Sequence, residues 1–101
     1  MLSGEVMGFL FEWDPTKAIA NLIDHGVSFE EATTVFADTL SLTIYDEEHS
    51  EDEDRWILLG MSIRQRLLVV VHTDRGDTIR LISARRATAH ERRTYEQRAR
   101  P

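Results

Sequence analysis

The spacing of the apolar residues changes near residue 40, and that change restricts the fold more than any other feature. Between residues 15 and 36 they recur at helical intervals, as in the stripe formed by Ala18, Ile19, Leu22 and Ile23. From residue 40 they alternate with polar residues, the period of a strand with one buried face. Helices that precede strands, instead of alternating with them, are typical of an α+β fold. Because 101 residues is an ordinary length for one domain, we expect one core and one site.

Capping signals indicate where the first helix begins and ends. Asp14 is a good N-cap acceptor, and Pro15 fits the first helical position, where its missing N–H costs nothing. His25 followed by Gly26 supplies a potential cation and a left-handed cap at the other end. These signals predict a helix over residues 15–25.

Two capping boxes predict the other helices. Ser28 precedes Glu31 by three residues, so a second helix is expected to run to about residues 36–38. Thr88 and Glu91 repeat this spacing and predict a last helix that continues towards residue 98.

The remaining segments predict an antiparallel meander of about four strands, with a short N-terminal edge strand over residues 9–13. The meander strands are expected at residues 40–45, 55–61, 67–73 and 78–85. In the last of them, alternation would place Ile79, Leu81 and Ser83 on one face and Arg80, Ile82 and Ala84 on the other. Residues 1–8 lack a periodic signal and are interpreted as a flexible N-terminal extension to a single domain over residues 9–101.

The charge of the chain is divided between its two halves. Residues 1–54 carry 14 carboxylates and one lysine, which gives −13, whereas residues 55–101 carry 11 arginines and four carboxylates, which gives +7. The total of −6 argues against nucleic-acid binding by the whole surface, but the arginine-rich half contains the side chain best suited to phosphate oxygens.

Several classes of function are disfavoured. The chain has no cysteine, which excludes disulfides and thiolate catalysis, and no apolar run approaches the length of a membrane span. Seven carboxylates in residues 46–54 cannot pack together, so they predict a solvated, mobile hairpin loop. The segment lacks the glycine and the ligand spacing of a calcium loop, so metal binding is not expected there. We therefore expect a cytoplasmic protein with no metal and no cofactor.

Ordered segments along most of the chain resemble the BrnT toxin family. They comprise Phe11-Glu12-Trp13-Asp14, Lys17, Asn21, the run from His25 to Glu30, Val35 to Asp38, Arg55-Trp56, His72-Thr73, Arg80 to Ala87, and Glu91-Arg92-Arg93 with Tyr95-Glu96. The resemblance spans residues 9–97, and the order and spacing of these segments make it more specific than any one of them.

The resemblance implies a RelE-like fold, metal-independent cleavage of RNA, and a BrnA-like antitoxin that occludes the toxin. It also implies that any contact with DNA is indirect, through the ribbon-helix-helix domain of that antitoxin.

Chemistry narrows the candidate catalytic residues. Metal-free RNA cleavage requires removal of the 2′-OH proton, stabilisation of a five-coordinate phosphate and protonation of the leaving oxygen. Arg80 and Arg85 are candidates for stabilising the phosphate, and His72 or Tyr95 for moving protons. Each has a structural alternative: a strand rim for Arg80, a solvated strand end for Arg85, a buried imidazole for His72 and helix packing for Tyr95.

Lys17, Arg55 and Arg86 are candidates for positioning RNA. Lys17 is equally consistent with a solvated helical lysine, and Arg55 with pairing to a neighbouring carboxylate. We expect one of Arg85 and Arg86 to be functional and the other solvated.

Two other functions compete with an RNA-cleaving toxin. The first is a catalytically degenerate module that pairs with an antitoxin and tunes transcriptional autorepression, which the net charge of −6 favours. The second is a stand-alone nucleic-acid binder.

Overall fold

The computed structural model describes residues 2–6 and 8–99. Its six strands are β1 (Leu2–Val6), β2 (Phe9–Trp13), β3 (Leu42–Tyr45), β4 (Trp56–Met61), β5 (Leu67–Arg75) and β6 (Thr78–Arg86). Its helices are α1 (Pro15–His25), α2 (Phe29–Thr34) and α3 (Ala89–Ala99), with 3₁₀ turns η1 (Val35–Ala37) and η2 (Glu47–His49). No helix in the described ranges is long and apolar enough to cross a membrane.

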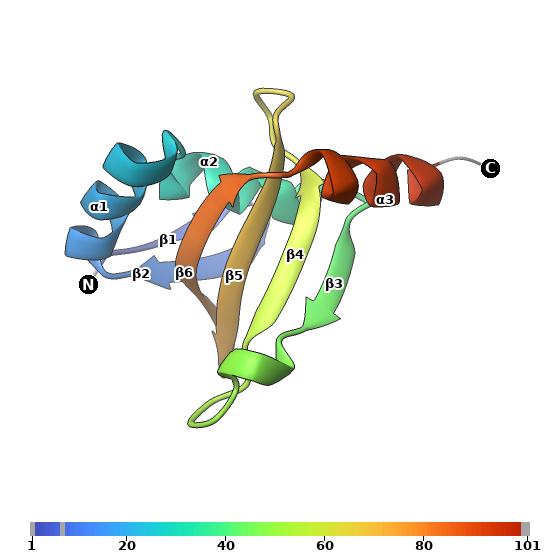
Figure 1. Ribbon diagram of the computed structural model, residues 1–101. Helices are drawn as coiled ribbons and strands as arrows, with labels where there is room; N and C mark the ends of the chain where they lie inside the picture. The colour runs from blue at the N-terminus through green and yellow to red at the C-terminus, as the bar shows by residue number, and fades with distance from the viewer. Residues whose placement is uncertain (1, 7, 100–101) are drawn as a thin grey trace.

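The strands form one sheet in the order β1-β2-β6-β5-β4-β3 (Figure 1). The α+β class and the antiparallel meander from β3 to β6 are confirmed. A purely antiparallel sheet with β2 at its edge is wrong, because β2 lies between β1 and β6 and pairs with β6 in parallel. β1 falls in the segment assigned to an extension. Its pairing uses backbone groups that every residue has, so side-chain periodicity did not predict it.

Helix α1 begins and ends where its capping signals predict. The side chain of Asp14 accepts a hydrogen bond from the N–H of Thr16 at 2.8 Å, and Gly26 closes the helix with a φ of 68°. Most of the apolar stripe of this helix is nevertheless turned to solvent, since Ile19 is 63% and Ile23 77% exposed. Ala18 packs against the core, and the buried Asn21 anchors α1 to the sheet.

Asn21 connects α1 to the last strand. Its amide donates to the carbonyl of Ala84 at 2.8 Å and to that of Val27 at 2.9 Å, and its oxygen accepts from the N–H of Ala84 at 3.0 Å. Because the pairing of β6 with β2 stops at Arg80, this side chain satisfies the backbone of β6 where no strand does.

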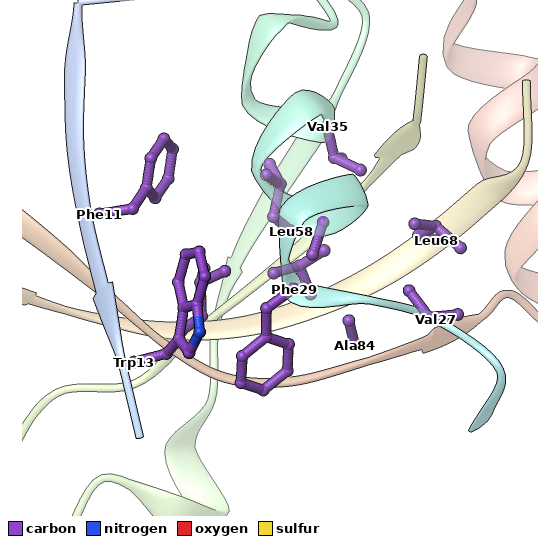
Figure 2. Close-up of a cluster of buried hydrophobic side chains, with 11 residues drawn as sticks. Phe11, Trp13, Val27, Phe29, Val35, Leu58, Leu68 and Ala84 are labelled. Atoms are coloured by element: carbon purple, nitrogen blue, oxygen red, sulfur yellow. The ribbon is translucent and has the colours of Figure 1, made fainter. Parts of the chain in front are cut away.

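The main core lies between the sheet and the helical layer of α1 and α2. Figure 2 shows Phe11 and Trp13 from β2 beside Phe29 from α2, with Leu58 and Leu68 from the central strands. These side chains are between 0% and 8% exposed, so one face of the sheet is sealed.

A buried ion pair fixes α2 to the turn between β4 and β5. The carboxylate of Glu31 accepts from Arg66 Nε at 2.9 Å, again from Arg66 Nη2, and from Ser62 Oγ at 2.7 Å. The capping box predicted for α2 is thus half formed: Ser28 Oγ accepts from the N–H of Glu31, but the Glu31 carboxylate bonds to Arg66 instead. The hydrogen bonds from Arg66, which outweigh the effect of burial, lower the pKa of Glu31.

A β-bulge in β6 changes which residues share a face. Val71 pairs with Ser83 and His72 with Leu81, so Ile82 is an extra residue. The strict alternation expected here is therefore wrong, and Leu81 and Ala84 both lie in the core.

The register assigns the other side chains of β6 to the opposite face. Arg80, Ser83 and Arg85 pair with Thr73, Val71 and Val69, which alternate along β5 and so share one face. Figure 1 shows this face to be free of α1 and α2, and we call it the open face.

Helix α3 covers one end of the open face (Figure 1). Tyr95 packs there with Leu59, Leu67 and Val69 in a second cluster. The predicted capping box is complete, since Glu91 accepts from the N–H of Thr88 at 2.8 Å and donates its own N–H to Thr88 Oγ1 at 3.2 Å.

Candidate nucleic-acid interface

A hollow of about 360 Å³ lies on the open face of the sheet. Its apolar floor includes Ile57, Val69 and Val71, from β4 and β5. Its polar lining consists of Ser83 and Arg85 from β6, Arg55 just before β4, and Asp46, Glu48 and His49 from the segment that connects β3 to β4. Residues far apart in the sequence thus meet at one concave surface.

Arg85 enters the hollow already paired. Its Nη1 lies 2.8 Å from Glu91 Oε1 and its Nη2 2.9 Å from Glu91 Oε2, a two-point contact with the first turn of α3. The hydrogen bond from Arg85, together with those from Thr88, lowers the pKa of Glu91 to about 2. The pair orients the guanidinium while leaving 41% of the Arg85 side chain exposed.

Arg55 faces the same hollow without a side-chain partner. Within the described residues its guanidinium makes no ion pair or hydrogen bond, although its backbone N–H donates to Ser50 Oγ at 2.9 Å. A half-buried, unpaired arginine in the same hollow as a second arginine offers several N–H donors to an anion with oxygens on more than one side.

The acidic segment forms one wall of the hollow. It was expected to be a solvated hairpin loop, and it does connect two antiparallel strands, but it also contains the turn η2. His49 Nδ1 lies 3.0 and 3.2 Å from the two carboxylate oxygens of Asp46. Sequence reasoning missed His49, whose only signal was a lone imidazole among seven carboxylates.

Arg80 lies on the open face but outside this hollow. It is five residues from Arg85, about 16 Å along a strand that rises about 3.3 Å per residue. Its Nη1 lies 3.3 Å from Glu12 Oε2, and both side chains are largely covered. The structure therefore does not bring Arg80 together with Arg55 and Arg85.

His72 lies on the opposite face, in the core. It is 6% exposed, and its ring packs edge-on against Phe36 with the centroids 5.0 Å apart. Neither ring nitrogen has a hydrogen-bond partner, since Asp74 Oδ1 is 3.7 Å from Nδ1. Burial lowers the pKa of His72, against a smaller opposing effect of Asp74. His72 is therefore a buried imidazole, the structural alternative to a catalytic role, and it lies away from the hollow.

Tyr95 is held beneath α3 by a carboxylate. Its hydroxyl donates to Asp38 Oδ2 at 2.6 Å, and the same oxygen accepts from the N–H of Met61 at 2.8 Å. Burial and this hydrogen bond raise the pKa of Tyr95 to about 12. The phenol is therefore protonated at neutral pH and does not line the hollow.

The two remaining cations named from the sequence point elsewhere. Lys17 is exposed on α1, in the layer that covers the other face of the sheet (Figure 1). Arg86 pairs with Leu68, so its side chain leaves β6 on the face opposite to that of Arg85. Across residues 2–6 and 8–99, no group of three or more His, Asp or Glu side chains is arranged to hold a metal ion.

Comparison with known proteins gives a matching family and a similar solved structure. Residues 13–91 match the model of a family described as ribonuclease toxin, BrnT, of type II toxin–antitoxin systems. The fold resembles the crystal structure of the Brucella abortus ribonuclease toxin BrnT, with a TM-score of 0.56 and 20% sequence identity over 75% of this chain and 92% of that one. No curated protein matches.

Proposed function

The chain belongs to the BrnT family of ribonuclease toxins of type II toxin–antitoxin systems, and from that premise we propose that it is an endoribonuclease. It cleaves RNA phosphodiester bonds in the cytoplasm, inhibits translation and arrests growth. Cleavage uses side chains alone and no bound metal.

The observation that carries this proposal is the presence of Arg55 and Arg85 in one hollow. A phosphodiester under attack gains negative charge on its non-bridging oxygens, and donors aimed at those oxygens lower the barrier. Arg85, oriented by Glu91, stabilises that charge, and Arg55, which has no protein partner to give up, binds the phosphate.

The apolar floor gives the hollow a second use. Ile57, Val69 and Val71 present apolar side chains in the same hollow as the two guanidinium groups. A nucleobase placed there buries apolar area while its phosphate meets the arginines, which positions RNA without reading its sequence.

Only some of the site residues named from the sequence have a role at the proposed site. We retain Arg85 and Arg55 and assign no contact with the scissile phosphate to Arg80, Arg86 or Lys17. His72 and Tyr95 support the fold, because both are buried by packing that closes them off from the hollow.

A type II toxin has an antitoxin partner. We propose a BrnA-like protein with a ribbon-helix-helix domain, so that this chain meets DNA only through its partner. The antitoxin covers α3 and the mouth of the hollow, burying on the order of 1,600 Å² in total as a standard interface does. Hydrogen exchange should slow over α3 and β6 on pairing, and unchanged exchange there would place the antitoxin elsewhere.

Induced expression in bacterial cells tests the proposal. The wild-type chain should arrest growth and shorten the half-life of cellular RNA, and Arg55→Ala and Arg85→Ala should each abolish both effects. Arg93→Ala, which removes an exposed cation of α3 outside the hollow, is the matched control and should remain toxic. The purified chain should cut RNA equally well with an excess of chelator. Full toxicity of both hollow variants would refute the proposed site.

A catalytically degenerate binding module remains the alternative. Asp46 and Glu48, whose carboxylates line the hollow and repel phosphate, favour it. A purified chain that leaves RNA intact but forms a tight complex with an antitoxin that represses transcription would support this function.

A further inference from the structure

We propose that His49, held by Asp46, is the general base that removes the proton from the attacking 2′-OH of RNA in the hollow. This inference rests on the proposed ribonuclease function and assigns its proton-transfer step. His72 and Tyr95, the two candidates named from the sequence for that step, do not line the hollow.

His49 lines the hollow together with Arg55 and Arg85, the two groups proposed to hold the phosphate. Its side chain is 62% exposed, so an RNA can reach the ring without any rearrangement of the core.

The Asp46 carboxylate orients the His49 ring. Nδ1 lies within 3.2 Å of both carboxylate oxygens of Asp46, and the Asp46 side chain is 12% exposed. A carboxylate accepts hydrogen bonds and does not donate them, so Nδ1 carries the proton and Nε2 of the neutral ring carries a lone pair. Asp46 thus fixes the tautomer in which the outer nitrogen is a base.

The segment that carries Asp46 and His49 is itself held in place by hydrogen bonds. The backbone carbonyl of Asp46 accepts from Ser50 Oγ, which in turn accepts from the N–H of Arg55 at 2.9 Å. The N–H of Asp46 donates to the carbonyl of Arg55 at 2.9 Å. The base and the phosphate-binding arginine are therefore set relative to one another by a short hydrogen-bonded loop.

The proposed step moves one proton from the 2′-OH to His49 and returns it through water. Nε2 of neutral His49 takes the 2′-OH proton while the 2′ oxygen forms a bond to phosphorus and the bond from phosphorus to the 5′ oxygen breaks. A water molecule protonates the departing 5′ oxygen, and the resulting hydroxide takes back the proton held by the imidazolium. The products are a 2′,3′-cyclic phosphate and a 5′-hydroxyl, and Asp46 stabilises the imidazolium while it exists.

The other histidines are placed differently. His25 ends α1 on the far side of the sheet, His72 is enclosed in the core, and His90 is exposed in the first turn of α3 and does not line the hollow. His25 is therefore a suitable control, since it is also exposed to solvent and lies outside the site.

His49 lies in a strongly charged environment, which bears on the pH dependence of the rate. The groups around His49 are Asp46, Glu48, Glu51, Asp52, Glu53 and Arg55 from its own segment, and Arg85 across the hollow.

The test is the single-turnover rate of RNA cleavage by the full purified chain. His49→Gln and His49→Ala should reduce the rate by about 100-fold or more and remove its rise with pH, whereas His25→Gln should match the wild type. Added imidazole should restore part of the rate to His49→Ala. Asp46→Asn should lower kcat with little change in KM, as expected of a positioning residue.

The outcomes separate this inference from the function on which it rests. If Arg85→Ala loses cleavage while His49→Gln stays within threefold of wild type, the ribonuclease stands and His49 is not its base. A loss in His49→Ala that imidazole does not restore, with an unchanged pH profile, would also overturn the assignment. A wild-type chain that leaves RNA intact would refute the proposed function and this step with it.

Discussion

Arg85 and Glu91 are joined by two parallel hydrogen bonds of 2.8 and 2.9 Å, between the end of β6 and the first turn of α3. The same carboxylate caps α3 through the N–H of Thr88. One acidic side chain therefore both starts the last helix and orients the cation proposed to stabilise the transition state.

Glu91→Gln should lower the free energy of unfolding at neutral pH by about 1 kcal/mol, a modest value because the Arg85 side chain is 41% exposed. The folded pKa of Glu91 is about 2, below its usual value of 4.5, so the stabilisation is complete above pH 4.5 and is lost as the pH falls towards 2. Urea unfolding of both proteins across this range should give curves that converge in acid. A difference that does not depend on pH would contradict the ion pair.

Arg66→Ala should destabilise the fold by about 3 kcal/mol or more, because it leaves the 5% exposed Glu31 carboxylate without its main partner. The matched control is Arg64→Ala. That guanidinium is 3.7 Å from Glu31 and 69% exposed, and its loss should cost about 0.5 kcal/mol or less. If urea denaturation gave the two variants equal losses in the free energy of unfolding, the buried geometry of Arg66 would have no special role.

Tyr95→Phe should lower the free energy of unfolding by about 1 to 2 kcal/mol, since it removes one donor from Asp38 and leaves the N–H groups of Met61 and Leu40 in place. The rate of RNA cleavage per folded molecule should stay within twofold of wild type. Loss of cleavage by a folded variant, as judged by circular dichroism, would instead make Tyr95 a functional residue.

Asn21→Ala should reduce both stability and cleavage. It removes three hydrogen bonds in a buried position and leaves the N–H and carbonyl of Ala84 unsatisfied, at a cost of about 2 to 3 kcal/mol. Ala84 precedes Arg85, so β6 loses its restraint beside the hollow and kcat should fall about tenfold. Leu22→Ala on the exposed side of α1 is the control. A destabilised variant with wild-type kcat would limit Asn21 to a structural role.

Glu48→Gln should strengthen binding of an uncleavable 2′-O-methyl RNA roughly threefold at low salt, because one negative charge leaves the wall of the hollow. Glu47→Gln changes the same charge in the same turn, but Glu47 does not line the hollow, so its effect should be smaller. Both effects should fade at high salt. Equal effects would indicate a general charge effect instead of contact with the hollow.

The sequence predicted best those elements whose signals are local. The bounds of α1 follow from Asp14, Pro15 and Gly26, each of which acts on its immediate neighbours. The complete capping box of α3 and the strands of the meander from β3 to β6 were also predicted from local signals. α2 was predicted to be longer than it is, because the helix tightens into the turn η1 at Val35.

The remainder depends on partners distant in sequence. Parallel pairing of β2 with β6 joins Phe11 to Ile79, and no local pattern encodes it. The bulge at Ile82 reverses the alternation that follows it, so the side-chain directions of Ser83 and Ala84 were misassigned. Arg55 and Arg85 were both named from the sequence, but that they meet was not predictable, since 30 positions separate them.

We propose that RNA lies in the hollow between Arg55 and Arg85. A titration of the isotope-labelled chain with a 2′-O-methyl RNA oligonucleotide, followed by backbone amide chemical shifts, locates the bound RNA. We predict the largest shifts at Val69, Val71 and Ser83 on the floor and side of the hollow, and none along α1. Shifts centred on α1 or on the Glu12 and Arg80 pair, with the hollow unchanged, would contradict it.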